Sequence, residues 1–358
     1  MPFSRYMEMC LYDPEVGYYS RNVEQFGKAG DFYTSSDVHA VFGRLMARQF
    51  EEMWRAMGSV EQIELIELGP GRGLLARDVL DWTAKKFPEF FAALQYVLIE
   101  QSPALRARLA ATLANHVDGR KVSIREELVS MSGGCRIVFA NEFFDALPVE
   151  VLSSEGELRI GERGGGFIET WASPRAEELE FLDKYGVHPE VGERVEVPLT
   201  AQRVMAEVAA RIGRGFLVTI DYGYTRDEQL AGRHRNTVTA YRQHSVSAAP
   251  YEAPGEQDIT AHVNFTALAA AAAEEGLRVK TLLTQSQFLM GIGEGNQFAD
   301  AFEECRLPQE RAKVALQLKH LITPAGMGES FHVLLASKGV APELADRLAG
   351  LSFGRPQA

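Results

Sequence analysis

The run Ile63-Glu64-Leu65-Ile66-Glu67-Leu68-Gly69-Pro70-Gly71-Arg72-Gly73 contains an apolar strand pattern that leads directly into a glycine-rich turn. A helix-forming segment follows from about Leu74. Glycine at 69, 71 and 73 lets the backbone turn sharply and approach a ligand without an intervening Cβ. The free N–H groups of the next helix point toward the same place. The run therefore predicts the cofactor-binding end of a nucleotide-type α/β fold.

The spacing of the glycines indicates which ligand this turn binds. A dinucleotide fingerprint reads Gly-x-Gly-x-x-Gly, but here Gly73 comes one residue early and position 74 is Leu. Glu67 would place a carboxylate near any pyrophosphate, which is unfavourable, whereas it suits a cationic or amino-bearing cofactor. We therefore interpret the turn, with Pro70 inside it, as a site for S-adenosylmethionine rather than for a hydride donor.

Length and composition describe an ordinary globular protein. The 358 residues are 46% hydrophobic and 24% charged, and no run of about 18 uncharged apolar residues could span a bilayer. The three cysteines lie far apart without a Cys-x-x-Cys pair, and the eight histidines show no metal-type spacing, so we expect no disulfide framework and no metal site. No signal or transit peptide is expected at the start of the chain.

The net charge of −12 restricts the class of partner. Proteins that grip nucleic-acid backbones neutralise phosphates with Lys and Arg, so an acidic chain does not fit that role. A basic protein segment is a more natural partner. The acidity is equally compatible with a simple role in keeping the protein soluble.

Strand and helix patterns alternate along most of the chain, which predicts a parallel sheet with helices on both faces. After an irregular, aromatic-rich entry over 1–36, the expected strands are 63–68, 96–100, 121–125, 136–140, 216–221, 278–283 and 331–337. The expected helices are 42–54, 74–86, 102–115, 201–212, 265–275, 298–304 and 309–321. Ser102 as N-cap and Pro103 at the first helical position open the third of them.

Two regions interrupt this alternation. Between about 148 and 198 the residues alternate around Gly164-Gly165-Gly166, which predicts a β-rich hairpin insertion with a short helix near 177–183. The polar region 226–254 shows no hydrophobic periodicity, and we interpret it as a loop on the substrate side. We expect an N-terminal covering segment at 1–60, a main domain at 61–340 with insertions at about 148–198 and 224–262, and a tail at 341–358.

Acidic residues close three of the expected strands, at the sheet edge where ligands bind. Glu67 belongs to the first strand and Glu100 ends the second, where its carboxylate could accept hydrogen bonds from both ribose hydroxyls. The alternative for Glu100 is a solvated strand-end carboxylate. Glu126 or Glu127 could meet an adenine amino group, although for these two a plain surface role is preferred.

The fourth strand leads into Asn141-Glu142-Phe143-Phe144-Asp145-Ala146-Leu147-Pro148. Two acids three residues apart, with aromatic rings between them, could clamp a guanidinium group, whose donors match carboxylates and whose plane stacks on rings. A carboxylate could also take up the proton that the attacking nitrogen loses. We therefore assign Glu142 and Asp145, with Asn141, as candidate catalytic residues. The alternative is that both phenylalanines belong to the core and that Asp145 caps a turn.

Other motifs admit a structural explanation. Gly30-Asp31-Phe32-Tyr33-Thr34-Ser35-Ser36 carries hydroxyls and an acid ahead of a helix, where Ser36 or Asp37 could be an N-cap. Asp221-Tyr222-Gly223 and Asp258-Ile259-Thr260-Ala261-His262 could be turn chemistry alone.

Taken together, the motifs resemble those of the MidA-like family and span nearly the whole chain in order. They are Tyr12-Asp13-Pro14, Gly17-Tyr18-Tyr19, Gly30-Asp31-Phe32, Thr34-Ser35, Glu67 to Gly73, Asn141 to Pro148, Asp221-Tyr222-Gly223, Asp258 to Val263, Thr284-Gln285 and Phe288-Leu289.

The resemblance implies a Rossmann-like class I methyltransferase with a seven-stranded, mostly parallel sheet. It implies S-adenosylmethionine as cofactor and S-adenosylhomocysteine as product. The family's cofactor residues carry over onto Glu67, Gly69, Gly71 and Glu100, with Pro70 and Gly73 in the same turn. By the Gly-Asp-Phe motif they also carry over onto Asp31, Thr34 and Ser35. An N-terminal helix that is usual in the family is short or absent in this sequence. The resemblance therefore gives less support to a homodimer formed through that helix.

Mitochondrial members of that family are protein arginine methyltransferases that act in complex I assembly. The resemblance thus implies a methyltransferase acting on a protein, with an arginine-bearing basic segment as substrate. We expect a bacterial-type cytoplasmic location, or the mitochondrial matrix for a trimmed eukaryotic protein. The alternatives are methylation of another substrate, a non-catalytic S-adenosylmethionine-binding assembly chaperone, and a nicotinamide oxidoreductase.

Overall fold

A computed structural model describes residues 1–20, 40–128, 134–242, 245–247 and 249–354. The chain divides into two compact units, each assembled from three segments. Unit 1 comprises 1–32, 142–207 and 222–275, and unit 2 comprises 33–141, 208–221 and 276–358. The chain passes from unit 2 to unit 1 between Asn141 and Glu142.

Unit 2 contains a sheet in which four neighbouring strand pairs are parallel: β3 (Val122–Arg125) with β2 (Leu94–Ile99), β2 with β1 (Ile63–Leu68), β1 with β4 (Cys135–Asn141), and β4 with β9 (Arg214–Tyr224). Two short strands, β14 and β15 (Leu283–Thr284), are antiparallel to β16 at the other end. The spatial order is β14 (Arg278–Val279), β16 (Phe331–Lys338), β9 (Arg214–Tyr224), β4 (Cys135–Asn141), β1 (Ile63–Leu68), β2 (Leu94–Ile99) and β3 (Val122–Arg125). This mixed α/β sheet confirms the predicted fold class.

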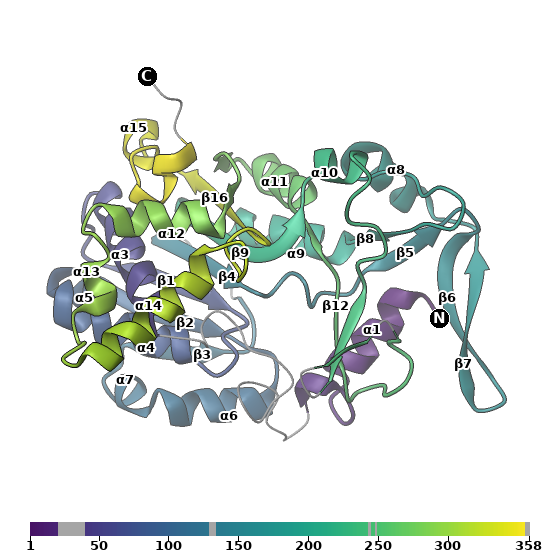
Figure 1. Cartoon of the computed structure of the whole chain (residues 1–358), viewed down its shortest axis with the longest axis horizontal. Coiled ribbons are helices and arrows are strands. Elements are labelled where there is room, and N and C mark those ends of the chain that lie inside the picture. Colours follow the sequence, from purple (N-terminus) through teal and green to yellow (C-terminus); the bar gives the residue numbers. More distant parts are fainter. Residues whose placement is uncertain (21–39, 129–133, 243–244, 248, 355–358) are drawn as a thin grey trace. The chain divides into compact units, whose positions relative to one another are not determined.

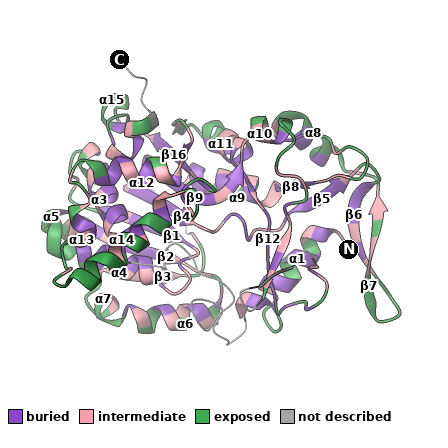
Figure 2. Ribbon diagram, viewed as in Figure 1, coloured by how far each residue is buried: buried purple, intermediate pink, exposed green. Residues whose placement is uncertain are grey.

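The central strands are apolar because both of their faces are covered. Leu65 and Ile66 point to opposite faces of β1, and both are buried, as are Ile137 and Val138 of β4. Figure 2 accordingly shows β1 and β4 largely in the buried colour. This buried centre holds the end of β1 in place for the glycine turn that follows.

The helices of unit 2 pack on this sheet and on one another. Phe50 of α3 (Ala40–Ala56) contacts Phe139 of β4 edge to face, with ring centroids 5.4 Å apart. At the start of α6 (Pro103–Thr112), the Ser102 hydroxyl accepts the Leu105 N–H at 3.3 Å, as predicted for the N-cap. The helices are α3 (Ala40–Ala56), α4 (Leu74–Lys86), α5 (Pro88–Ala93), α6 (Pro103–Thr112), α7 (Ala114–Asp118), α12 (Gln285–Glu294), α13 (Ala299–Phe302), α14 (Pro308–Ile322) and α15 (Pro342–Ala345).

Unit 1 contains the predicted β-rich insertion. A four-stranded antiparallel sheet has the order β7-β6-β5-β8, and Gly164 and Gly165, both at positive φ, turn the long β6–β7 hairpin visible in Figure 1. Its elements are β5 (Glu150–Ser153), β6 (Gly156–Arg163), β7 (Gly166–Ala172), α8 (Ala176–Tyr185) and β8 (Arg194–Val197). Helix α9 (Leu199–Ala210) leads out of this unit.

The rest of unit 1 comes from the N-terminus and from 222–275. The remaining elements are α1 (Phe3–Tyr12), η1 (Tyr18–Ser20), α10 (Arg226–Leu230), β10 (Thr239–Arg242), β11 (Ser245–Ser247), β12 (Asp258–Thr260), β13 (Val263–Asn264) and α11 (Phe265–Glu274). Strand β13 runs parallel to the end of β9, pairing Val263 with Gly223.

Three sequence expectations about elements were wrong. The entry is not irregular, because 3–12 form α1, whose buried side chains recur at helical spacing: Phe3, Tyr6, Met7, Cys10 and Leu11. The region 226–254 is not only loop, since it contains α10, β10 and β11. Helix α12 was not expected, although Thr284 and Gln287 form a capping box at its start.

The expected strand 278–283 is split into β14 and β15. Val279 pairs with Ala336 and Leu283 pairs with Val333, so four residue steps here accompany three in β16. The extra residue breaks the ladder in the manner of a bulge.

No helix among the described residues combines the length and apolar character that crossing a membrane requires.

Candidate functional site

The glycine turn after β1 adopts the backbone that its residues permit. Gly69, Gly71 and Gly73 have φ of 60°, 52° and 73°, in the left-handed region that residues with a Cβ rarely occupy. The Gly69 N–H donates to the Ile99 carbonyl at 3.1 Å, and the Gly73 N–H donates to the Pro70 carbonyl at 2.8 Å. The turn is thus tied to the end of β2 and closes on itself before α4 begins.

Gly73 is the N-cap of α4 and lies against α6. A Cβ at this position would come within 2.8 Å of Leu109 Cδ2, so no larger residue fits without displacing that side chain. The result is a compact turn with backbone N–H groups at a helix N-terminus, the arrangement that holds the polar part of a nucleoside cofactor.

Glu67 is a buried carboxylate two residues before this turn, with 4% of its surface exposed. Tyr96 of β2 donates its hydroxyl to Glu67 Oε2 at 2.8 Å. Burial raises the pKa of Glu67 to about 7, and the Tyr96 hydrogen bond opposes part of that rise. A carboxyl group poised in this way would ionise when a cationic ammonium group arrives beside it.

Glu100 directly follows β2. Its carboxylate accepts the Ser102 N–H at 2.7 Å, and its own N–H donates to the Arg125 carbonyl at 3.0 Å. Burial raises the pKa of Glu100 to about 7 despite the Ser102 hydrogen bond. The side chain is therefore fixed at a strand end, with the acceptor capacity that ribose hydroxyls require. Together with the turn and Glu67, it fits S-adenosylmethionine.

Three further residues expected at the cofactor, Asp31, Thr34 and Ser35, lie outside the described residues. Their role stays a prediction.

The acidic loop begins where β4 ends. Asn141 is the last residue of β4, and the next residue, Glu142, has a φ of 50°. A glutamate in the left-handed region is strained, and such strain is concentrated at functional positions. Glu142 is half-buried.

Asp145 is the buried acid of this loop, with 6% of its surface exposed. Tyr222, near the end of β9, donates its hydroxyl to Asp145 Oδ2 at 2.5 Å, and the Asp145 carbonyl accepts the Ala261 N–H at 3.0 Å. Burial raises the pKa of Asp145 to about 6, while the Tyr222 hydrogen bond lowers it. Asp145 can therefore exchange a proton near neutral pH.

The two phenylalanines of the loop differ in burial. Phe144 is 3% exposed, whereas Phe143 is half-buried, and the two ring centroids lie 5.2 Å apart. A ring that stacks on a substrate must be accessible, so Phe143 fits the expected clamp better than Phe144.

Sequence reasoning did not assign a functional role to the tyrosines around these acids. Tyr222 contacts Asp145, and Tyr19 donates its hydroxyl to Asp258 Oδ1 at 2.8 Å. Tyr12 donates to the Ala146 carbonyl at 2.9 Å. The available signal was the position of Asp221-Tyr222-Gly223 at a strand end, which predicts the edge of the sheet but not the hydrogen-bond partner.

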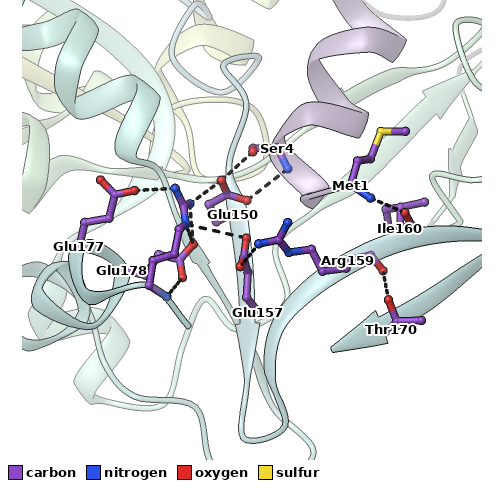
Figure 3. Close-up of polar contacts among 10 residues, drawn as sticks. Met1, Ser4, Glu150, Glu157, Arg159, Ile160, Thr170, Glu177 and Glu178 are labelled. Atoms are coloured by element: carbon purple, nitrogen blue, oxygen red, sulfur yellow. Dashed lines mark hydrogen bonds and ion pairs between the residues drawn. The ribbon is translucent and has the colours of Figure 1, made fainter. Parts of the chain in front are cut away.

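One group of three buried carboxylates, Glu150, Glu157 and Glu178, has a geometry that could hold a metal ion, with ligand oxygens within 4.8 Å of one another. Arginines contact all three, as drawn in Figure 3. Arg175 Nη2 lies 2.7 Å from Glu150 and 2.6 Å from Glu178, and Arg159 Nη2 lies 2.8 Å from Glu157. These contacts make an ion-pair network that joins β5, β6 and α8.

Comparison with known proteins gives one family. Residues 45–283 match the family described as S-adenosyl-L-methionine-dependent methyltransferase.

The curated relatives are similar over most of their length. The mitochondrial protein arginine methyltransferase NDUFAF7 homolog of Drosophila melanogaster is 30% identical over 99% of this chain and 85% of its own. The mitochondrial protein arginine methyltransferase NDUFAF7 of Homo sapiens is 27% identical over 92% of this chain and 78% of its own.

Among solved structures, a protein of Burkholderia thailandensis was crystallised bound to S-adenosyl-homocysteine. It is 28% identical, with a TM-score of 0.83 over 100% of this chain and 92% of its own.

Proposed function

Since the chain belongs to the MidA-like family of S-adenosylmethionine-dependent methyltransferases, we propose that its substrate is an arginine side chain of a protein. The observation that carries this proposal is the acidic loop, in which Glu142 and the buried Asp145 directly follow a central strand of the sheet. The names of the relatives at 27–30% identity, protein arginine methyltransferases, support the same reading.

The chemistry of guanidinium methylation explains why acids are needed. A guanidinium has a pKa above about 12, and its positive charge is delocalised over three nitrogens. Carboxylates on one side draw that charge away from the attacking nitrogen and orient it. S-adenosylmethionine supplies the methyl group. We assign Glu142 and Asn141 to orienting the guanidinium, and Asp145 to accepting the proton that the nitrogen releases.

The cofactor residues are part of the proposal. Glu67 would face the amino group of the cofactor, Glu100 would accept from the ribose hydroxyls, and the turn from Gly69 to Gly73 would surround the nucleoside. Asp31, Thr34 and Ser35 would complete the site.

The proposed partner rests on the relatives' names and on the net charge of this chain. An acidic protein of net charge −12 would bind a basic segment around the target arginine. We propose a bacterial-type cytoplasmic location, or the mitochondrial matrix for a trimmed eukaryotic protein, and a complex I subunit as the class of target that the family resemblance suggests. We also retain a homodimer and the division at about 1–60, 61–340 and 341–358 as proposals.

The test is methyl transfer from S-adenosylmethionine carrying a radioactive methyl group. Purified protein is incubated with a protein extract and the donor, and labelled arginines are located by mass spectrometry. We expect label on arginine with the wild type and its loss in Glu142→Ala and Asp145→Ala. The matched controls are Glu180→Ala and Asp183→Ala, both exposed acids of α8 in surface ion pairs.

Two outcomes would contradict the proposal. Label on another residue type would leave a methyltransferase with a different substrate. No label with the wild type, although S-adenosylhomocysteine binds, would favour the non-catalytic assembly chaperone.

A further inference from the structure

The hydroxyl of Tyr222 donates a hydrogen bond to the buried acid of the loop. It lies 2.5 Å from Asp145 Oδ2, at the short end of the range for a hydroxyl donating to an ionised oxygen. Tyr222 is half-buried and is carried by β9, whose preceding residues pair with β4. The donor therefore sits on a rigid strand, whereas the acceptor sits on a loop.

The Asp145 segment is fixed at two further points. The Asp145 carbonyl accepts the Ala261 N–H, and the next carbonyl, that of Ala146, accepts the Tyr12 hydroxyl. With the main chain held at these two consecutive carbonyls, the Tyr222 contact acts on the side-chain torsions of Asp145, so it selects where the carboxylate points.

Several titratable groups surround this contact. On the N-terminal segment, Tyr12 reaches the loop, and Tyr19 has its pKa raised by burial and then by the charges of Asp258 and Asp145. From the segment before β13, the His262 ring packs edge to face on Tyr222 with centroids 5.4 Å apart. Burial lowers the pKa of His262 to about 4, so this ring is neutral at neutral pH.

A hydroxyl can favour one protonation state of its partner. Tyr222 donates to Asp145, and an ionised carboxylate accepts such a bond more strongly than a neutral carboxyl does. Burial pushes in the opposite direction by disfavouring the charge. Two backbone hydrogen bonds, from Ala146 and Asp145, also oppose burial, but the Tyr222 hydroxyl is the largest of the opposing contacts, so without it Asp145 would hold its proton to higher pH.

We propose that Tyr222 is a positioning residue that aims the carboxylate of Asp145 and keeps it ionised and able to accept a proton. This inference rests on the proposed function, in which Asp145 receives the proton of the target nitrogen. As the new N–CH3 bond forms, the S–CH3 bond of the donor breaks and its electron pair returns to sulfur. The nitrogen then releases one proton to Asp145, and neutral S-adenosylhomocysteine leaves.

The experiment compares Tyr222→Phe with a control that loses an equivalent hydrogen bond elsewhere in unit 1. Tyr251→Phe is suitable, because the Tyr251 hydroxyl donates to Glu169 at 2.8 Å and Arg194 also holds that carboxylate. The proton occupancy of Asp145 is followed by 13C NMR of γ-labelled aspartate in the complex with S-adenosylhomocysteine, with Asp145→Asn assigning the signal. Methyl transfer is measured from pH 5.5 to 8.5 on a synthetic peptide containing the arginine labelled above.

One hydrogen bond from a neutral donor corresponds to about one pKa unit. We therefore expect Tyr222→Phe to move the Asp145 titration and the acidic limb of the rate upward by about one unit. The rate would fall about five-fold at pH 6 and little at pH 8. Tyr251→Phe should move neither quantity.

An unmoved Asp145 titration in folded Tyr222→Phe would overturn the inference, and so would an equal loss of rate at every pH. Should that variant not fold, 3-fluorotyrosine at position 222 replaces it. Its more acidic hydroxyl donates more strongly and should lower the pKa of Asp145, and an absence of shift would contradict us. Because the NMR titration needs no substrate, the inference can fail while arginine methylation stands, and the reverse is equally detectable.

Discussion

Two sets of buried carboxylates in this protein are held by different donors. Glu150, Glu157 and Glu178 are held by arginines, whereas Glu67 and Asp145 accept hydrogen bonds from tyrosine hydroxyls. An arginine neutralises the charge of its partner permanently. A tyrosine donates without neutralising, so burial can raise the pKa of Glu67 to about 7 and that of Asp145 to about 6.

Under the proposed function, the arginine-held acids are structural and the two tyrosine-held acids act at the site. An acid paired with arginine contributes to the architecture, because the guanidinium compensates its charge. An acid that accepts from tyrosine remains able to bind a cation or a proton. The acids of the second set belong to the glycine turn and to the loop after β4, the two places where the sequence predicted chemistry.

The most direct test of this comparison is to neutralise Asp145, one of the two acids that accept a hydrogen bond from tyrosine. We expect Asp145→Asn to lower the rate of methyl transfer by about 10²–10⁴-fold, because a proton acceptor is lost. The free energy of unfolding at pH 8 should not fall, since a buried charge is removed and an amide oxygen can still accept from Tyr222. Timed assays of methyl transfer measure the rate, and urea unfolding measures the stability. A loss of stability without a loss of rate would show that Asp145 has a structural role, like the carboxylates held by arginine.

Removing an arginine should have the opposite effect. Arg175→Ala leaves Glu150 and Glu178 buried without their shared guanidinium, and we expect the free energy of unfolding to fall by about 2 kcal/mol. This is less than for a fully buried pair, because 41% of the Arg175 side chain is exposed. In urea unfolding, the exposed pair Arg5–Glu8 provides the control, and Arg5→Ala should change stability by less than about 0.5 kcal/mol. Equal effects of the two variants would show that the buried network contributes no more than a surface pair.

The pH dependence of ligand affinity tests the comparison at Glu67. With a pKa of about 7 before binding, Glu67 is mostly protonated at pH 6 and must lose that proton to face a cationic amino group. The affinity for S-adenosylhomocysteine should therefore rise about ten-fold from pH 6 to pH 8 and level off above pH 7. Calorimetry checks this as a difference, because Glu100 also has a pKa of about 7 and contributes to the pH dependence of any ligand with a ribose. Glu67→Gln, and the amine-free ligand methylthioadenosine, should each show a smaller rise that lacks the Glu67 contribution. A similar rise in either control would assign the titration to another group.

The smallest effect is expected where one acid has both kinds of donor. Glu169 accepts from Arg194 and from Tyr251, and the Arg194 hydrogen bonds hold its pKa below the usual value. Tyr251→Phe should lower the free energy of unfolding by about 0.5–1 kcal/mol. Stability should still be lost only as the pH falls through the lowered pKa of Glu169. A new loss of stability near pH 6 would mean that the tyrosine, not the arginine, controls this carboxylate.

Much of the sheet was predictable because its signals are local. Ile63–Leu68 shows the apolar run of a strand covered on both faces, and the glycines after it have the positive φ that their spacing predicts. Ser102 before Pro103 marked a helix start that the structure confirms. The residue patterns predicted seven strands and a methyl-donor cofactor, and the resemblance to a family implied the same two features.

What the sequence could not predict depends on contacts between distant segments. Helix α1 is an exception, because its buried residues recur at helical spacing and a local signal was present. The tyrosine partners of the acids were missed because Tyr96 and Tyr222 lie 29 and 77 residues from Glu67 and Asp145. No local pattern reports such pairings, whereas the acids themselves stood at strand ends and could be identified.

A crystal structure with S-adenosylhomocysteine tests the central assignment most directly. We expect the nucleoside at the turn formed by Gly69, Gly71 and Gly73, its ribose hydroxyls within hydrogen-bond distance of Glu100, and its amino group on the side of Glu67. A nucleoside bound elsewhere, or one that contacts the arginine-held carboxylates instead, would contradict the account.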